Sequence, residues 1–288
     1  MNKNLRPAYI TDEKLIAFIH QAFKEDVGDG DHSTLASIPF EAQNRAQLLV
    51  KEDSVLAGVE MAQLIFNYYD PDLKFETFIS DGELVKTGDI AFIVHGSAQS
   101  ILTCERLVLN VMQRMSGIAT LASSMAKEVE HTRAKILDTR KTTPNFRMFE
   151  KWAVVIGGAH NHRFGLFDMI MLKDNHVDFA GGIEKAVEKT RNYLSENNLN
   201  LKIEVETRNL DEVDQALRAK VDRIMLDNFT IEHTKLAVNR INGVCEIEAS
   251  GGITLETLRS VAETGVNFIS SGAMIHSAKN IDFSLKAF

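Results

Sequence analysis

The sequence predicts an α/β fold dominated by an open, incomplete α/β barrel of the TIM-like type. Four short apolar runs each end in a polar residue, and these ends lie 21, 23 and 21 residues apart, at Glu206, Asp227, Ser250 and Ser271. That period accommodates one strand, one loop and one helix, and an unbroken series of such units is typical of a parallel barrel. Six strands are expected, fewer than the eight of a closed barrel: 135–139, 168–173, 202–207, 223–228, 245–250 and 267–271.

The N-terminal part predicts helices and short strands. Residues 11–26 are amphipathic with Thr11 as N-cap, and "GDGDHS" then predicts a plain turn, because a calcium loop would need a later glutamate. Residues 46–96 alternate like short strands, interrupted by one helix. The remaining helices are expected at 60–69, 99–128, 209–219, 230–241 and 254–264, and the tail 276–288 has a weak helical signal.

Bulk properties restrict the function. The net charge of −8 argues against general nucleic-acid binding. No apolar run approaches 18 residues and the N-terminus lacks a signal-peptide core, so neither a membrane partner nor secretion is expected. Cys104 and Cys245 lack metal-ligand spacing, which predicts buried, reduced thiols in a cytoplasmic protein.

Glycines follow two consecutive strands of the predicted barrel. "ASGGI" precedes a helix that Thr254 can cap, and "SSGA" repeats the arrangement one strand later. Backbone N–H groups of such loops, together with a helix N-terminus, bind phosphate in barrels. Tight strand-to-helix turns are the alternative interpretation.

Acidic and basic residues end the other strands. Glu206 and Asp227 occupy equivalent places on neighbouring strands, which suggests Mg²⁺ held largely through water and substrate oxygens, or else ion pairs with Lys or Arg. Lys173 is either an anion ligand or a Schiff-base nucleophile of an aldolase. Arginine forks suit planar carboxylates, and the candidate cations are Arg140, Lys141, His162, Arg163 and Lys173.

Long motifs resemble the quinolinate phosphoribosyltransferase family, also called nicotinate-nucleotide pyrophosphorylase (carboxylating). The signature block is "LDTRKTTPNFRMFEKWAVVIGGAHNHRFGLFDMIMLKDNH", and "CERLVLNVMQRMSGIAT", "MLDNF", "EASGGI" and "ISSGA" match further blocks in order. The resemblance covers nearly the whole chain. It implies an N-terminal α/β sandwich domain over 1–115, with the tail 276–288 packed back on it, and a barrel domain over 116–275.

The resemblance also implies a reaction and a site. Phosphoribosyl pyrophosphate and quinolinate would give nicotinate mononucleotide, CO₂ and pyrophosphate in NAD biosynthesis, with Mg²⁺ as cofactor. The active unit would be a homodimer, with higher assembly left open, in which Arg106 is donated across the interface. Catalysis would involve Lys141, Lys173, Glu206 and Asp227; substrate would also contact Thr139, Arg140, His162, Arg163, Ser250, Gly251, Gly252, Ser271, Gly272 and Ala273.

Three departures from the family pattern fall in the signature block. Asn145-Phe146 stands where the family usually has Gly-Leu, Trp152 replaces a usual Tyr, and Ala159 replaces a third Gly. None removes an implied ligand. The alternatives are a paralogue found with molybdenum-transport genes, the Schiff-base aldolase and a non-catalytic pyridine-carboxylate sensor; the retained Glu206 and Asp227 argue against the sensor.

Overall fold

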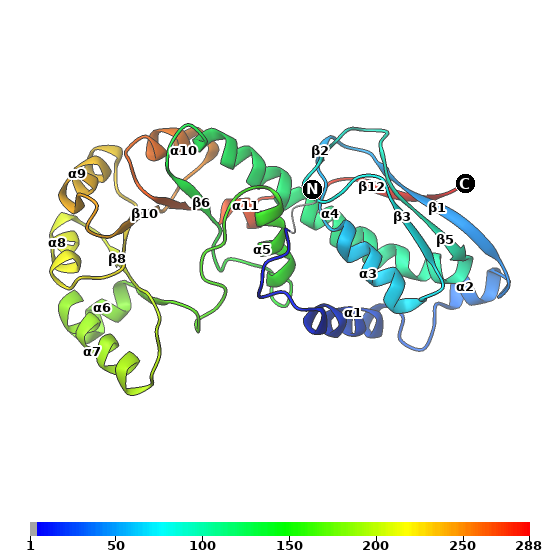
Figure 1. Cartoon of the computed structure of the whole chain (residues 1–288), viewed down its shortest axis with the longest axis horizontal. Helices are drawn as coiled ribbons and strands as arrows, with labels where there is room; N and C mark the ends of the chain where they lie inside the picture. Colours follow the sequence, from blue (N-terminus) through cyan, green and yellow to red (C-terminus); the bar gives the residue numbers. More distant parts are fainter. Residues whose placement is uncertain (1–4) are drawn as a thin grey trace. The chain divides into compact units, whose positions relative to one another are not determined.

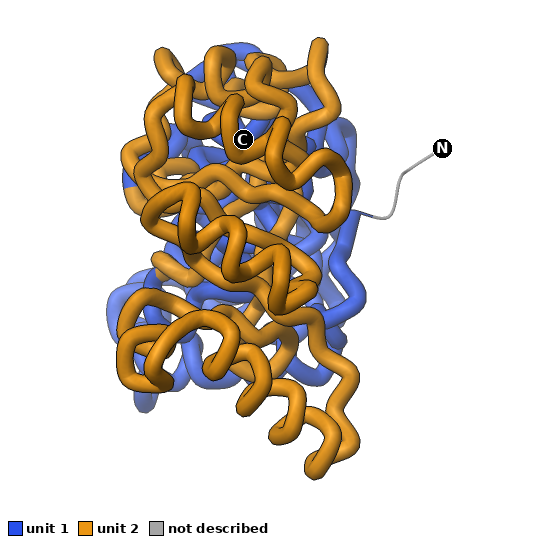
Figure 2. Tube along the Cα trace, turned by 90° about the vertical axis from the view of Figure 1, so that its left-hand side faces the viewer, with its two compact units in different colours: residues 1–123, 143–158, 277–288 blue, residues 124–142, 159–276 orange. Residues whose placement is uncertain are grey.

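The computed structural model describes residues 5–288, which form two compact units (Figure 2). The first contains the chain up to Ser123 together with Thr143–Gly158 and Ser277–Phe288, and the second contains Ser124–Thr142 and Ala159–His276. Within residues 5–288, no helix combines the length and the hydropathy needed to cross a bilayer.

The first unit is built on a four-stranded antiparallel sheet in the order β12-β1-β5-β3, beside a short β2-β4 pair. Phe66 from helix α3 contacts Phe75 and Phe92 of the sheet and closes the core. Its elements are α1 (Asp12–Asp26), α2 (His32–Ser37), β1 (Gln43–Val50), β2 (Ser54–Val55), α3 (Val59–Tyr69), β3 (Lys74–Thr77), β4 (Leu84–Val85), β5 (Ile90–Ser97), most of α4 (Ala98–Val129), α5 (Arg147–Ile156) and β12 (Phe283–Ala287).

Two local predictions for this unit need correction. The "GDGDHS" segment is not only a turn, because Asp31 accepts the Thr34 backbone N–H at 3.1 Å and so begins α2. The prediction of a weakly helical tail is wrong, because the tail contains strand β12. This strand pairs antiparallel with β1, which lies near the other end of the chain. The Thr11 cap of α1 is confirmed by its hydrogen bond from Lys14 N. Cys104 is buried, but Cys245 is only half-buried.

The second unit is the predicted open barrel. All six strands are present and parallel, in the order β6-β11-β10-β9-β8-β7, with helices outside them (Figure 1). The elements are β6 (Lys135–Leu137), β7 (Ile170–Leu172), α6 (Asp174–Ala180), α7 (Ile183–Glu196), β8 (Ile203–Thr207), α8 (Leu210–Arg218), β9 (Arg223–Asp227), α9 (Ile231–Ile241), β10 (Glu246–Ser250), α10 (Leu255–Ala262), β11 (Phe268–Ser270) and α11 (Ala273–His276).

The barrel is open between β6 and β7, which are consecutive in the chain but unpaired. His160 lies beside β6 in an isolated parallel bridge to Leu137, donating its N–H to Ile136 O at 2.9 Å. This single pair extends the sheet past β6. His162 and Arg163 follow this bridge, so they occupy the position of residues at the C-terminal end of a strand.

One departure in the signature block has a local explanation. Asn145 has φ 64°, a left-handed conformation that glycine adopts most easily and asparagine tolerates best among the other residues. Ala159 is buried directly before the His160 bridge, and nothing in the structure explains alanine in place of glycine there.

Candidate active site

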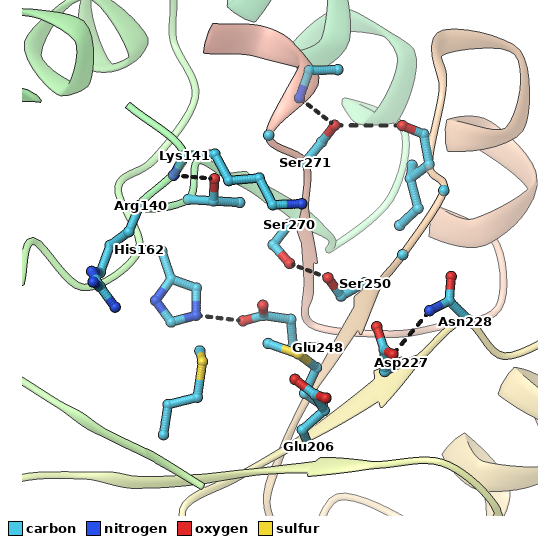
Figure 3. Close-up of a pocket in the computed structure, with 18 of the residues that line it drawn as sticks. Arg140, Lys141, His162, Glu206, Asp227, Asn228, Glu248, Ser250, Ser270 and Ser271 are labelled. Atoms are coloured by element: carbon cyan, nitrogen blue, oxygen red, sulfur yellow. Dashed lines mark hydrogen bonds and ion pairs between the residues drawn. The ribbon is translucent and has the colours of Figure 1, made fainter. Parts of the chain in front are cut away.

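A cavity of about 770 Å³ lies at the C-terminal ends of the barrel strands (Figure 3). Its volume suits small-molecule substrates. Except for Arg106, every residue expected at the site lines this cavity: Thr139, Arg140, Lys141, His162, Arg163, Lys173, Glu206, Asp227, Ser250, Gly251, Gly252, Ser271, Gly272 and Ala273. The lining also contains residues that the sequence did not single out, among them Asn228, Glu248 and Ser270.

Glycines and serines form one end of the cavity. Gly251 and Gly252 both have left-handed backbones, with φ 93° and 61°, directly before the N-terminus of α10. The Ser270 hydroxyl donates to Ser250 Oγ at 3.0 Å and so links the ends of β10 and β11. Such a loop and helix start can present backbone N–H groups to a phosphate.

Replacing Gly251 with alanine should impair this end of the cavity selectively. An added Cβ would overlap the Asn228 side chain and lie 2.9 Å from its backbone N, which donates to Ser250 O at 2.9 Å. Because the connection after β9 must then shift, we expect kcat/KM for phosphoribosyl pyrophosphate to fall about 100-fold.

The matched control is Gly243→Ala, which has an equally left-handed φ of 77° but open space around its Cβ. Steady-state kinetics of both variants test the expectation. Equal losses in the two variants would contradict it, because they would point to backbone strain alone.

The acids at the ends of β8 and β9 differ in their contacts. Lys173 Nζ lies 3.0 Å from Glu206 Oε2, so the ion-pair alternative applies to Glu206. Asp227 Oδ2 accepts from Asn228 Nδ2 at 2.9 Å. Lys173 Nζ donates to a carboxylate, whereas Schiff-base lysines are typically activated in an apolar pocket or beside another cation. The arrangement therefore favours anion binding by Lys173.

Cations line the side of the cavity beside the barrel opening. The Arg163 guanidinium is held by Met169 O at 3.0 Å from Nη1. Burial lowers the pKa of Arg163, and the charge of Arg140 lowers it further. Two guanidinium groups whose charges repel each other in a partly buried cavity favour an anionic ligand between or beside them.

His162 lies on the cavity floor against two buried carboxylates. Its Nε2 is 3.2 Å from Glu204 Oε2 of β8 and 3.2 Å from Glu248 Oε2 of β10. Arg223 of β9 donates to Glu248 Oε2 at 3.0 Å. Asp138 fixes the backbone of the same segment, accepting from His162 N at 2.7 Å. We call His162, Glu204 and Glu248 the floor cluster.

Sequence reasoning missed the two carboxylates of the floor cluster. They occupy strand positions within "KIEVE" and "EIEAS", where the pattern of the strands predicts core. The charge of these residues was the available signal. A Glu is rarely buried completely without a partner, so a Glu at a core position predicts a buried cation or hydrogen-bond donor beside it.

The floor cluster favours a charged histidine. Burial alone would lower the pKa of His162, but its hydrogen bonds and ion pairs with Glu204 and Glu248 raise it to about 9. The backbone N of Arg163 lies 2.6 Å from Nδ1, a contact that only the neutral ring accepts. Two carboxylates in a dry interior outweigh that single neutral hydrogen bond.

This charge makes stability depend on pH. The folded pKa exceeds the usual value of 6.5, so the His162 contribution is complete below about pH 6.5 and is lost as the pH rises through about 9. The full loss should be about 3 kcal/mol, from 1.4 kcal/mol per unit. Urea unfolding at pH 6 and 9.5 should show that wild type loses more stability than His162→Gln; equal losses would contradict the charged histidine.

Arg106 is the one expected site residue outside the cavity. It is exposed on α4 in the first unit. Among residues 5–288, its side chain forms neither a hydrogen bond nor an ion pair.

An open parallel barrel whose cavity combines glycine loops at a helix start, two strand-end acids and a cationic wall suits an enzyme that acts on phosphorylated, anionic substrates. Models of the quinolinate phosphoribosyl transferase N-terminal and C-terminal domains match residues 31–116 and 118–286. The chain belongs to the quinolinate phosphoribosyltransferase family.

Individual relatives agree over nearly full length. Quinolinate phosphoribosyltransferase (decarboxylating) 1b of Nicotiana tabacum is 48% identical, covering 97% of this chain and 84% of that protein. The chloroplastic nicotinate-nucleotide pyrophosphorylase (carboxylating) of Arabidopsis thaliana is 46% identical, covering 99% and 86%. The crystal structure of NadC from Streptococcus pyogenes has a TM-score of 0.91 at 39% identity, covering 96% of this chain and 97% of that one.

Proposed function

We propose that this chain transfers a phosphoribosyl group from phosphoribosyl pyrophosphate to quinolinate and decarboxylates the product to nicotinate mononucleotide. The observation that supports this most directly is a single cavity that joins a phosphate-binding loop to a wall of arginines and lysines, with two carboxylates between them. One end suits the 5′-phosphate of the sugar. The other suits an acceptor with two carboxylates.

The transfer forms one bond and breaks another at C1 of the ribose. The pyridine nitrogen supplies its electron pair to C1 while the bond to pyrophosphate breaks and its electrons leave with the pyrophosphate. The sugar develops oxocarbenium character, and the carboxylates of Glu206 and Asp227 stabilise that positive charge. Lys173, whose Nζ lies 3.0 Å from Glu206 Oε2 in the same cavity, contributes positive charge for the entering anions.

The residues present fit Mg²⁺ as the cofactor. Glu206 and Asp227 offer carboxylate oxygens at the ends of neighbouring strands, the ligand type that Mg²⁺ prefers. When bound, Mg²⁺ would neutralise charge on the pyrophosphate.

Decarboxylation needs no base from the protein. Once the ring nitrogen is bonded to C1, its positive charge stabilises the electron pair left at C2 when the 2-carboxylate departs as CO₂. A solvent proton then replaces the carboxylate. Positioning of the two carboxylates by the cationic wall is the contribution of the chain.

We further propose that the active form is a homodimer in which Arg106 reaches the site of the partner subunit. Arg106 is exposed on α4 and is not among the residues that line the cavity, which supports this. A cytoplasmic location remains our proposal from the reduced thiols.

The test is product formation from quinolinate, phosphoribosyl pyrophosphate and Mg²⁺, with nicotinate as the control acceptor. We expect nicotinate mononucleotide and CO₂ from quinolinate alone. Binding without turnover by folded protein would indicate a sensor, and turnover only with another acceptor would indicate a paralogue of different specificity.

A further inference from the structure

The floor cluster joins three strands of the barrel beneath the cationic wall. Glu204 comes from β8, Glu248 from β10, and Arg223 from β9 between them. Both carboxylates are completely buried, and the His162 side chain is 5% exposed. Burying two carboxylates is costly unless they have a definite partner, and His162 Nε2 lies within 3.2 Å of both.

The cluster is connected directly to the cations of the cavity. Arg163 directly follows His162, whose Nε2 lies 3.2 Å from both buried carboxylates, and Asp138 accepts both His162 N and Asn161 Nδ2 at 2.7 Å. The segment that leaves the sheet after His160 is therefore fixed at its ring and at its backbone. Glu204 does not line the cavity, so it can affect a ligand only through its neighbours.

We propose that Glu204 and Glu248 are positioning residues for the dicarboxylate acceptor, acting through His162 to hold the His162–Arg163 segment against the cavity. The inference rests on the proposed function, because it assigns a role at the acceptor end of that site. Neither residue belongs to the expected ligand set.

A metal ion is the competing explanation of the same three side chains, whose ligand atoms lie within 4.8 Å of one another. Glu248 Oε2 already accepts from the Arg223 guanidinium at 3.0 Å. A divalent ion on that oxygen would lie next to a fixed positive charge in a dry interior, which is unfavourable. His162 Nε2 lies 3.2 Å from both carboxylates, so a charged ring can balance their charge without a metal ion.

The deciding variant is Glu204→Gln, which keeps the shape and one acceptor but removes the charge. We expect KM for quinolinate to rise about tenfold, while kcat and KM for phosphoribosyl pyrophosphate change less than about threefold. Glu206 lies two residues further along β8. A general distortion of that strand would therefore displace Glu206 as well, which would lower kcat and raise KM for phosphoribosyl pyrophosphate. That pattern would overturn the positioning role.

The matched control is Glu246→Gln on β10. Glu246 contacts Arg223 at 3.1 Å but not His162, and it does not line the cavity. Its KM for quinolinate should stay within about twofold of wild type.

A double-mutant cycle tests whether the effect passes through His162. In a His162→Gln background, Glu204→Gln should have no further effect on KM for quinolinate. Additive losses would overturn the inference, as would a stoichiometric metal in purified wild type that Glu204→Gln loses.

Should Glu204→Gln not fold, Glu248→Gln takes its place. If neither variant folds, NMR of the wild type provides the test. The chemical shift of the His162 ring should change when quinolinate is added and should not change when phosphoribosyl pyrophosphate is added; the reverse would overturn the inference.

These outcomes separate the inference from the function beneath it. Absence of product from wild type would refute the proposed function. Normal wild-type turnover with an unchanged KM in folded Glu204→Gln would refute the positioning role alone.

Discussion

Arg106→Ala should abolish turnover, and mixing it with inactive Lys173→Ala should restore about a quarter of the wild-type activity. In a random mixture half the dimers are hybrid, and each hybrid has one site with both substitutions and one with neither. The expectation depends on Arg106 and Lys173 coming from different subunits to one site. The exposed position of Arg106 and the cavity position of Lys173 are consistent with that requirement.

The matched control uses two variants of the same cavity. Arg163→Ala mixed with Lys173→Ala should remain inactive, because both residues line the cavity of one chain and no hybrid site is intact. Subunit exchange must be verified with differently tagged chains. Hybrid dimers that form and stay inactive with Arg106→Ala would exclude the shared site.

Asp227→Asn and Glu206→Gln should each lower kcat by about 100- to 1,000-fold, with a small effect on KM for quinolinate. Both remove negative charge where the sugar becomes positive in the transition state, while keeping the size of the side chain. Glu206→Gln also releases Lys173 from its ion pair. That release should not compensate, because a free ammonium beside a developing cation is repulsive.

Asp214→Asn provides the control for this pair. Asp214 lies on the outer helix α8 in an exposed ion pair with Arg240, so the same chemical change there should leave kcat unaltered. Single-turnover measurements would assign the loss to chemistry. A KM increase with normal kcat in Asp227→Asn would instead show that the carboxylate only binds substrate.

The barrel and the gathering of polar residues in one cavity were predictable because both depend on local repetition. Each strand of the barrel ends within a few residues of its predicted position, and the polar residues at those ends share one cavity. Parallel strands place their C-terminal ends at one edge, so spacing along the chain was sufficient.

Features that depend on distant partners were not predictable. The floor cluster requires Glu204, Glu248 and His162 to meet from segments 42 or more residues apart. The tail becomes a strand only because β1 offers it an edge, and no local pattern records that. Asp31 is a local example of the same limit. Its side chain caps α2 only because the turn before the helix places it beside Thr34 N, and the sequence pattern does not show that turn geometry.

The pairing of β12 with β1 also constrains how the chain matures. Val50 is opposite Phe283, so β1 gains this partner only after residues far along the chain have been synthesised. Until then, β1 exposes unpaired backbone groups that another nascent chain could join. Contacts this distant in sequence also slow folding. The first sheet therefore reaches its four-stranded form only late in synthesis.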